Sequence, residues 1–385
     1  MTTLAAARVV TGSEVHTPGW VAYAAGRITG VGEGRPDQID EDLGGATVVP
    51  GFVDNHTHGG GGGSYSTTDP AVAQTAIDTH RRHGTTTTMA SLVTGSPDEL
   101  LAFVSMLTGL YQDGLVAGIH LEGPWISPHR CGAHDPTQLR APDPAEISRL
   151  LAAAGGAIAM VTLAPELPGG QDAVRQFADA GVTAAVGHTE GTYDDARRAI
   201  DSGARVATHL FNAMRPIQHR EPGPIVALLE DPRVTVELIS DGTHVHSAIH
   251  RFVTSTAGPD RVALVTDAMS AADLGDGTYR LGQMDVDVHA GVAHIAGTDT
   301  LAGSTTTIDA LFRRAVLNLT GADAAPDDVT DEALLLASAQ ASGNPARVLG
   351  RSDIGTLAVG SRADIVVLDA DLAVSRVIVA GVPQL

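Results

Sequence analysis

The chain has 385 residues, 43% hydrophobic and 18% charged, and so can bury a core larger than one minimal domain needs. Its formal net charge of -21 argues against nucleic acid and anionic membrane as partners, because a polyanion would be repelled over the surface. All 24 basic residues are arginine, which excludes Schiff-base chemistry on lysine and a carboxylated lysine bridging two metals.

The sequence shows neither a targeting segment nor a membrane span. It has no uninterrupted apolar run of about 18 residues, and its N-terminus lacks the charged start and apolar core of a signal peptide. The single cysteine, Cys131, cannot form an intramolecular disulfide. We therefore expect a soluble, cytoplasmic protein.

The two ends of the chain share a strand-rich pattern. The first 45 residues carry short apolar runs, such as Ala6 to Val10, separated by glycine and charged turns. The C-terminal stretch repeats this pattern, with strands expected at 363–368 and 374–379. These features predict a small β-sandwich domain built from residues 1–50 and 350–385.

Between these ends, apolar strand-like runs alternate with helix-like segments, as in repeated βα units. The runs cover residues 48–58, 85–91, 116–122, 157–164, 183–188, 205–209, 234–240 and 262–267. Eight such units close a TIM barrel, an α/β fold whose catalytic groups sit at the C-terminal ends of the strands. We therefore expect residues 51–349 to form a metal-dependent (β/α)8 domain, with a hairpin-like insertion at 275–297 and helices at 305–349.

The strongest chemical signal is the pair His56 and His58 after the first run. Residues two apart on a strand point to the same side, so both rings can converge on one ion. The pair alone is weak, because many such pairs are structural or surface histidines. Glu122, His188 and His209 add suitable ligands at three later strand ends. Imidazole and carboxylate suit zinc, iron or similar divalent ions, and the absence of cysteine ligands disfavours a structural zinc site.

Asp267 ends the eighth run. A carboxylate beside a metal can take a proton from the attacking water and pass it to a leaving amine. Asp is also a favoured helix N-cap, and without the metal ligands that interpretation would be preferred. With the ligands present, we predict that Asp267 is a catalytic base and acid.

Several strings together resemble the amidohydrolase superfamily, and within it the branch that deacetylates amino-sugar phosphates. The strings are PGFVDNHTHG at 50–59, HLEGP at 120–124, GHT at 187–189, THLFNAM at 208–214, DGTH at 241–244, TDA at 266–268 and LAGS at 301–304. GSRAD at 360–364 is general for the superfamily, whereas HLEGP and HLFNAM point to the deacetylase branch. The resemblance covers essentially the whole chain.

The resemblance implies hydrolysis of N-acetyl-D-glucosamine 6-phosphate to D-glucosamine 6-phosphate and acetate in amino-sugar metabolism. Glu122 would bridge two metals, one held with His188 and His209 and the other with His56 and His58. Asp267 would also touch the second metal. Some relatives bind one ion, but with all these ligands present we expect two per subunit. Zinc is the first choice, with iron, manganese, cobalt or cadmium as alternatives.

The resemblance also implies the substrate contacts. His244 would polarise the acetamide carbonyl or stabilise the oxyanion. Asn212 and Ala213 would offer backbone N–H groups to the phosphate, and Arg220 would bind it with help from His219. The other expected contacts are Ala133, His134 at a sugar hydroxyl and Leu301 at the acetyl group. In such enzymes the arginine segment can reach the neighbouring subunit's site, so we expect a homodimer, although Arg220 could equally be a solvated surface residue.

Cys131 lies in a loop rich in turn-forming residues, shortly after Glu122. We expect this loop to act as a lid whose cysteine affects turnover without doing the chemistry. The alternative is an incidental free thiol.

Three alternative functions share part of this pattern. N-acetylgalactosamine 6-phosphate, the C4 epimer of the substrate, would satisfy the same motifs. Enzymes that open cyclic or peptide amides, such as dihydroorotase, hydantoinase or dipeptidase, usually carry the bridging lysine that this chain lacks. A scaffold without catalysis would typically have lost ligands, whereas this chain has the whole set.

Overall fold

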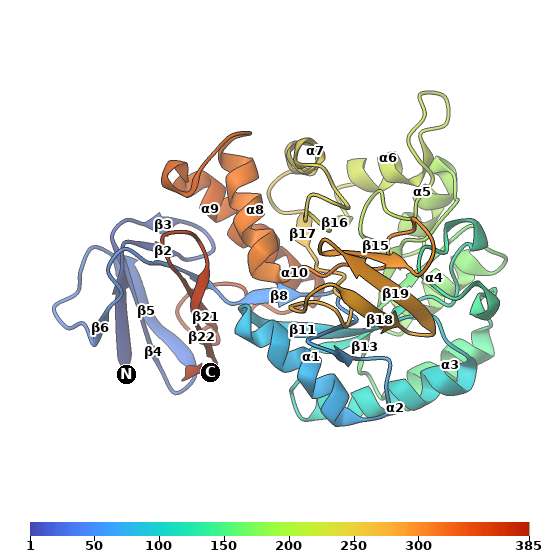
Figure 1. The fold of residues 1–385 in the computed structure, drawn as a ribbon, viewed down its shortest axis with the longest axis horizontal. Coiled ribbons are helices and arrows are strands. Elements are labelled where there is room, and N and C mark those ends of the chain that lie inside the picture. The colour runs from blue at the N-terminus through green and yellow to red at the C-terminus, as the bar shows by residue number, and fades with distance from the viewer. Residues whose placement is uncertain (385) are drawn as a thin grey trace.

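The computed structural model describes residues 1–384. Its centre is a parallel eight-stranded sheet in which each strand neighbours the next one along the chain (Figure 1). The strands are β8 (Phe52–Asp54), β11 (Thr85–Leu92), β12 (Gly118–Glu122), β13 (Ile158–Leu163), β14 (Thr183–Val186), β15 (Ala204–Ala207), β16 (Thr235–Leu238) and β17 (Val262–Leu264). They fall within the eight predicted runs or within one residue of them, and the predicted α/β barrel is confirmed.

The barrel closes between its first and last strands. Just beyond β8 and β17, Thr57 and Ala268 form an isolated parallel bridge. The backbone N–H of Asp267 donates to the carbonyl oxygen of His56 at 2.8 Å. Closure therefore places the His-x-His segment directly beside Asp267.

Helices cover the outside of the barrel. They are α1 (Pro70–Arg82), α2 (Pro97–Gln112), α3 (Pro144–Ala154), α4 (Gly170–Asp179), α5 (Tyr193–Asp201), α6 (Gly223–Glu230), α7 (Ser247–Ala257) and α8 (Ile308–Thr320). In α2, for example, Ser96 and Glu99 form a capping box, and Leu100, Val104 and Leu107 are buried at helical spacing. The predicted helical region 305–349 continues as α9 (Asp331–Ser338), a π-helical turn at 339–343 and α10 (Asn344–Val348).

Strands from both ends of the chain form two sheets beside the barrel. One contains β5 (Arg27–Glu33), β4 (Gly19–Ala24), β1 (Thr2–Ala6) and β6 (Glu41–Asp42). The other contains β23 (Val382–Pro383), β22 (Val374–Val379), β21 (Ile365–Leu368), β7 (Thr47–Pro50), β2 (Arg8–Val10) and β3 (Val15–His16). Their shared core includes Leu4, Val21, Val48, Ile365 and Ile378. This packing supports the predicted sandwich, and its division from the barrel at residues 50 and 350 stays a prediction.

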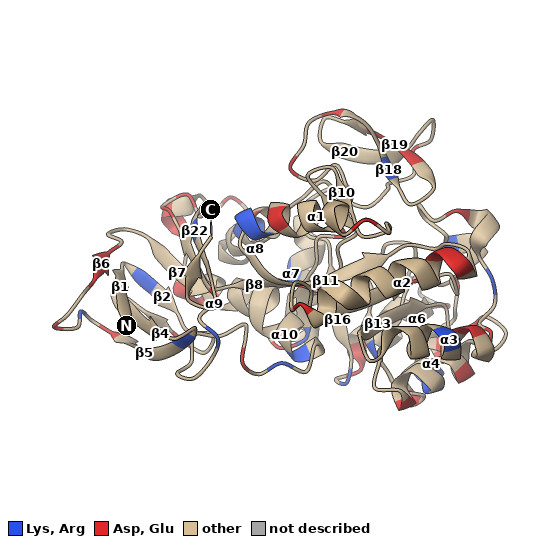
Figure 2. Ribbon diagram, turned by 90° about the horizontal axis from the view of Figure 1, so that it is seen from below, with Lys and Arg blue, Asp and Glu red and all other residues tan. Residues whose placement is uncertain are grey.

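The insertion after β17 has one strand more than the predicted hairpin. It forms an antiparallel sheet of β18 (Gly277–Leu281), β19 (Met284–His289) and β20 (Val292–Ile295). Leu281 and Val286 pack with Val93 and Met269, and Ala133 lies against the same cluster. In Figure 2 this sheet lies above β10 (Gly63–Ser64), which pairs with β9 (Gly59–Gly60).

Acidic residues are spread over the helices and turns of the whole molecule (Figure 2). This distribution agrees with 45 acidic and 24 basic residues in the sequence. Within residues 1–384, none of the helices combines the length and apolarity that a membrane crossing requires.

Candidate active site

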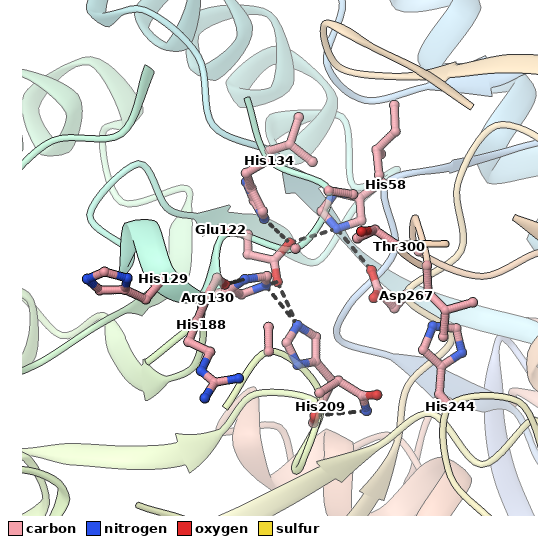
Figure 3. A pocket seen from close by; sticks show the side chains of 18 residues that line it. His58, Glu122, His129, Arg130, His134, His188, His209, His244, Asp267 and Thr300 are labelled. Carbon is pink, nitrogen blue, oxygen red and sulfur yellow. Dashed lines mark hydrogen bonds and ion pairs between the residues drawn. The ribbon is translucent and has the colours of Figure 1, made fainter. Parts of the chain in front are cut away.

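The C-terminal ends of the barrel strands deliver histidines and carboxylates into one cavity of about 340 Å³ (Figure 3). Of the predicted site residues, those that line it are His58, Glu122, Ala133, His134, His188, His209, Asn212, Ala213, His244, Asp267 and Leu301. His56 lies fully buried beside them. The structure thus brings these predicted residues together, and their roles stay predictions.

Three of these side chains follow their strands through strained turns. His188, His209 and Asp267 have φ angles of 48°, 27° and 48°, in the left-handed region that costs energy for residues with a Cβ. Such strain persists where the surrounding structure enforces it, most often at functional sites. The glycine before His188 also permits a close approach, because a Cβ on Gly187 would lie 2.7 Å from the side chain of Thr162.

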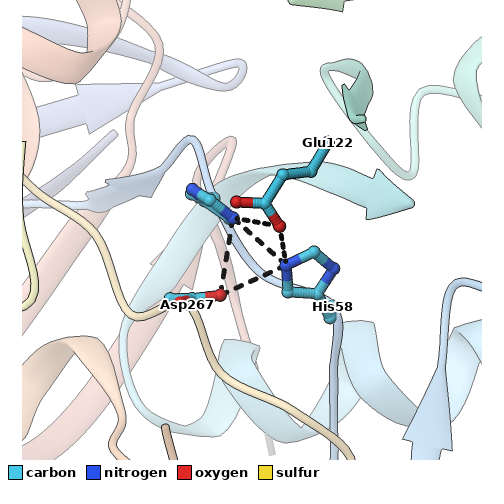
Figure 4. A group of neighbouring side chains, drawn as sticks. His58, Glu122 and Asp267 are labelled. Atoms are coloured by element: carbon cyan, nitrogen blue, oxygen red, sulfur yellow. Dashed lines mark hydrogen bonds and ion pairs between the residues drawn. The ribbon is translucent and has the colours of Figure 1, made fainter. Parts of the chain in front are cut away.

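The first ligand group lies around His58. Its Nδ1 is 3.1 Å from the carbonyl oxygen of Ser91, which can only accept, so Nδ1 carries the hydrogen and Nε2 a lone pair. That lone pair faces Oε2 of Glu122 at 3.0 Å and Oδ1 of Asp267 at 3.2 Å (Figure 4). Nε2 of His56 joins them, 3.1 Å from Nε2 of His58. Acceptor atoms at these distances repel one another unless a proton or a metal ion lies between them.

The second group is built in the same way. Nδ1 of His188 donates to the carbonyl oxygen of Arg130 at 2.8 Å, which leaves a lone pair on Nε2. This atom lies 3.1 Å from Nε2 of His209 and 3.1 Å from Oε1 of Glu122. Glu122 therefore presents Oε1 to one histidine pair and Oε2 to the other, which is the arrangement expected of a bridging carboxylate.

His134 lies close enough to Glu122 and His188 to be counted as a third ligand. Its hydrogen bonds argue against that role. The backbone N–H of Thr94 donates to Nδ1 of His134 at 3.2 Å, so Nε2 carries the hydrogen. Nε2 then points this hydrogen at Oε2 of Glu122, 3.4 Å away. This geometry favours His134 as a donor to Glu122 rather than as a metal ligand, and its predicted contact with a sugar hydroxyl stays a prediction.

The charges of the cluster favour a bound cation. Burial opposes a charge on His56, but Glu122 and Asp267 outweigh it and raise the pKa of His56 well above its usual value. Burial also opposes ionisation of Glu122 and Asp267, yet the histidines hold the pKa of both carboxyls well below the ordinary range. The donor set of imidazole nitrogens and carboxylate oxygens therefore fits a divalent metal, which would supply the missing positive charge.

His244 is the hydrogen-bond donor of the cavity. Its Nδ1 lies 2.8 Å from Oδ2 of Asp241, whose other oxygen accepts the backbone N–H groups of Thr243 and His244. Burial disfavours the charged ring, but Asp241 outweighs burial and raises the pKa of His244. With Nδ1 bound to Asp241, Nε2 is the nitrogen that can donate to a ligand.

The predicted phosphate-binding residues are only partly brought together. The backbone N–H of Asn212 already donates to the carbonyl oxygen of His209 at 3.0 Å, whereas that of Ala213 finds no acceptor among the described residues. His219 and Arg220 are exposed in the segment 216–221, outside the cavity of their own chain. This segment belongs to the yellow-green loop that projects beyond α5 and α6 in Figure 1.

The loop that follows β12 lines part of the cavity, and its role as a lid stays a prediction. His129, Arg130, Gly132 and Ala133 line the cavity, whereas the half-buried Cys131 between them does not. Arg130 was not among the predicted site residues; its Nε donates to Oε2 of Glu190 at 2.5 Å. The one feature of the sequence that could have indicated Arg130 is its position in the predicted lid loop.

Two further buried polar residues were missed. His120 hydrogen bonds to Oγ of Ser91 at 2.9 Å and to Oγ1 of Thr162 at 2.8 Å, and burial lowers its pKa well below the usual value. Glu237 on β16 lies 3.6 Å from His56. The signal for Glu237 was an acidic residue in the middle of an apolar barrel run.

Comparison with known proteins places the chain in a family. The sequence profile of the amidohydrolase family matches residues 47–383. The chain belongs to this family. The amidohydrolase family is metal-dependent, and the His/Glu/Asp cluster of this member can hold a metal ion.

Known proteins that are named as deacetylases match most of the length of this amidohydrolase. It is 37% identical to the N-acetylglucosamine-6-phosphate deacetylase of Bos taurus, over 91% of this chain and 86% of the relative. It is 36% identical to the N-acetylgalactosamine-6-phosphate deacetylase of Escherichia coli O157:H7, over 87% and 86%. A solved structure of the N-acetyl-D-glucosamine-6-phosphate deacetylase of Mycobacterium smegmatis, an Asp-to-Ala mutant in complex with N-acetyl-D-glucosamine-6-phosphate, is 55% identical with a TM-score of 0.95, covering 99% of this chain and 98% of that one.

Proposed function

We propose that this amidohydrolase hydrolyses N-acetyl-D-glucosamine 6-phosphate to D-glucosamine 6-phosphate and acetate. The observation that carries the proposal is the Glu122 carboxylate between two histidine pairs, with Asp267 and His244 in the same cavity. The substrate is suggested by the 55% identity, over 99% of the chain, to the M. smegmatis deacetylase.

The proposed metal ligands are the two groups of side chains on either side of Glu122. His188 and His209 would hold one ion with Oε1, and His56 and His58 would hold another with Oε2 and Asp267. When bound, such an ion lowers the pKa of water toward about 7 and polarises an amide carbonyl. We propose two ions per subunit, with zinc first among the divalent metals that imidazole and carboxylate accept.

The chain's own residues move the protons. Asp267 is a carboxylate at neutral pH, because the neighbouring histidines hold its pKa below the ordinary range, so it can accept a proton from the attacking water. It then passes that proton to the sugar nitrogen as the C–N bond breaks. His244, fixed at Nδ1 by Asp241, donates from Nε2 to the oxygen of the acetyl carbonyl as negative charge develops there.

The phosphate requires a cation in a strongly acidic protein. We propose that Arg220 and His219, which lie outside the cavity of their own chain, complete the site of a second copy in a homodimer. Arg130 lines the chain's own cavity, but its guanidinium is paired with Glu190. The Ala213 N–H is the backbone donor left for the phosphate.

We also keep the proposal that the loop around Cys131 is a lid. Four of its residues line the cavity, and Ser127 begins its short helical turn η1 (Pro128–Arg130) as an N-cap. Because the Cys131 side chain is not among those that line the cavity, its effect on turnover would pass through the conformation of the loop. Kinetics of Cys131→Ser that match the wild type would exclude that effect.

The second candidate substrate is N-acetyl-D-galactosamine 6-phosphate, suggested by the E. coli relative. The two sugars differ only in the orientation of the C4 hydroxyl. The metal groups, Asp267 and His244 would act on either sugar, so the contacts of the sugar ring decide between them.

The test is acetate release by the purified, metal-loaded protein from three substrates: N-acetylglucosamine 6-phosphate, its galactosamine epimer and unphosphorylated N-acetylglucosamine. Strong preference for the first supports the proposed substrate and the need for a phosphate. Preference for the epimer selects the second candidate. No release from any of them, with metal shown to be bound, would reject the deacetylase proposal.

A further inference from the structure

Glu237 is a fully buried acid in the interior of the barrel. On β16 its neighbours Val236 and Leu238 face the apolar layer between barrel and helices, as alternate residues of a strand do. Glu237 therefore points the other way, toward the barrel axis, and its solvent exposure is 0%. A barrel interior is normally filled by apolar, branched side chains.

This carboxylate has no ordinary partner. Neither of its oxygens accepts a hydrogen bond from any described residue, and no arginine among them forms an ion pair with it. The chain contains no lysine. An isolated buried carboxylate costs several kcal/mol, on the order of the stability of a whole domain. A residue that brings such a cost into the core needs a compensating partner.

The group placed to be that partner is His56. Oε2 of Glu237 lies 3.6 Å from Nδ1 of His56, and this nitrogen also lacks a partner among the described residues. A small side-chain rotation that brings the two atoms to about 2.8 Å would satisfy both with one charge-assisted hydrogen bond. The opposite nitrogen of the same ring, Nε2, faces Glu122 and Asp267, each at 3.4 Å.

Two of the other metal-site histidines show why this contact matters, whereas Nδ1 of His209, like that of His56, has no partner among the described residues. His58 and His188 are each fixed by a backbone carbonyl, from Ser91 and Arg130, which sets Nδ1 as the donor. His56 has no such carbonyl. A carboxylate in this position fixes the same tautomer and, being charged, also strengthens the ligand more than a carbonyl can.

We propose that Glu237 is a positioning residue for the metal site: its carboxylate accepts the Nδ1–H of His56 and so aims Nε2 at the ion held by His56 and His58. The inference rests on the proposed metal-dependent function. It assigns a third carboxylate to the site, after Glu122 and Asp267, which acts through a histidine rather than on the ion or the substrate.

The test measures zinc affinity rather than activity alone. Metal-free protein is titrated with Zn²⁺ against a chromogenic chelator, for the wild type, Glu237→Gln and Glu237→Leu. We expect the site formed by His56 and His58 to lose about 10- to 100-fold in affinity and the other site to keep its affinity. The loss should be larger for Leu, which cannot accept a hydrogen bond, than for Gln, which keeps an acceptor without the charge. Thermal unfolding of the metal-free Gln variant should occur at or above the wild-type temperature, since a buried charge has been removed.

A matched control is Glu146→Gln. Glu146 is another buried acid, 4% exposed, but it pairs with Arg140 outside the cavity. Its variant should unfold at a lower temperature and bind zinc like the wild type. In a His56→Ala background, Glu237→Leu should cause no further loss of zinc affinity, because its effect passes through His56.

Unchanged zinc affinity in both Glu237 variants, or a fall in metal-free stability alone, would overturn the inference and leave the proposed function standing. A wild-type protein that binds no divalent metal would overturn both. If Glu237→Leu fails to fold, the zinc affinity of the isosteric Glu237→Gln variant alone tests the inference.

Discussion

The carbonyl oxygen of Arg130 accepts a hydrogen bond from Nδ1 of His188 at 2.8 Å, so the loop over the cavity is attached directly to a proposed metal ligand. The backbone N–H of Ser127 also donates to the carbonyl oxygen of His188, at 2.9 Å. A Cβ on Gly132 would lie 3.2 Å from Cε1 of the same ring, which shows how closely the loop packs on it. The orientation of His188 and the position of the loop are therefore coupled.

This coupling predicts that metal removal loosens the loop. Without an ion at Nε2, the His188 ring can rotate and give up its bond to Arg130. Amide hydrogens of residues 127–134 should then exchange at least several-fold faster in chelator-treated protein than in zinc-loaded protein, as measured by mass spectrometry. Helix α3 lies outside the cavity and should exchange equally in both samples. Identical loop exchange in the two states would contradict the coupling.

Replacing Asp267 by Asn should separate catalysis from metal binding. The amide cannot accept the proton of the attacking water, so kcat should fall by about 10²- to 10⁴-fold. The remaining ligands should still hold metal, with at most a weakened second site, because Asp267 is one of several groups around it. Metal content by elemental analysis, measured beside kcat, checks both points. Near-normal turnover would refute the assignment of Asp267.

The barrel could be predicted because each strand is an apolar run of suitable length followed by polar residues. The run 48–58 shows the limit of this reasoning. Its first part is β7 in the sandwich sheet and its later part is β8 in the barrel. Both parts are buried, so hydropathy cannot assign them to different sheets. The division lies at Gly51, where a Cβ would be 2.3 Å from Oγ1 of Thr86.

The candidate site was predictable to the same degree. Histidines and carboxylates at strand ends must meet at one end of a parallel barrel, so their convergence follows from the fold class. Their tautomers do not, because these depend on acceptors such as Ser91 and Arg130 that no motif contains. Glu237 escaped notice because a single acid in an apolar run carries no motif at all.

Stability should depend on pH through His83. Nδ1 of His83 lies 3.1 Å from Asp309 and its Nε2 lies 3.2 Å from Asp273. The hydrogen bond to Asp309 raises the pKa of His83. A raised folded-state pKa contributes stability that is complete below the unfolded value of about 6.5 and is lost as pH rises through the folded value.

We therefore expect His83→Gln to destabilise the protein by about 1 kcal/mol near pH 5.5 to 6 and by progressively less as the pH rises through the raised folded-state pKa of His83. Thermal unfolding of both proteins across this range, at equal metal loading, measures the difference. His289→Gln is the control, since the side chain of His289 is 93% exposed on β19. A stability difference between wild type and His83→Gln that grows with pH would contradict the prediction.

Arg220 offers a test of the proposed dimer. If its guanidinium binds the substrate phosphate, Arg220→Ala should raise KM for the phosphorylated sugar by about 10- to 100-fold, the cost of a lost charge-assisted hydrogen bond. The same variant should leave the slow reaction of the unphosphorylated sugar unchanged. Arg35→Ala is a matched control, because Arg35 is also exposed but lies in the sandwich and pairs with Asp42.

Mixed dimers decide whether Arg220 acts across subunits. Subunits carrying Asp267→Asn have the intact arginine loop, and subunits carrying Arg220→Ala have the intact proton acceptor. If Arg220 serves the partner's cavity, a dimer with one subunit of each kind contains one complete site, so unfolding and refolding the two together should recover activity at low substrate that neither variant has alone. Mixed dimers verified by mass spectrometry but without this recovery would place Arg220 outside the partner's site. The exposed loop 216–221 would then have to fold back to reach the cavity of its own chain. Otherwise the substrate phosphate would be bound by Arg130 and the backbone N–H of Ala213.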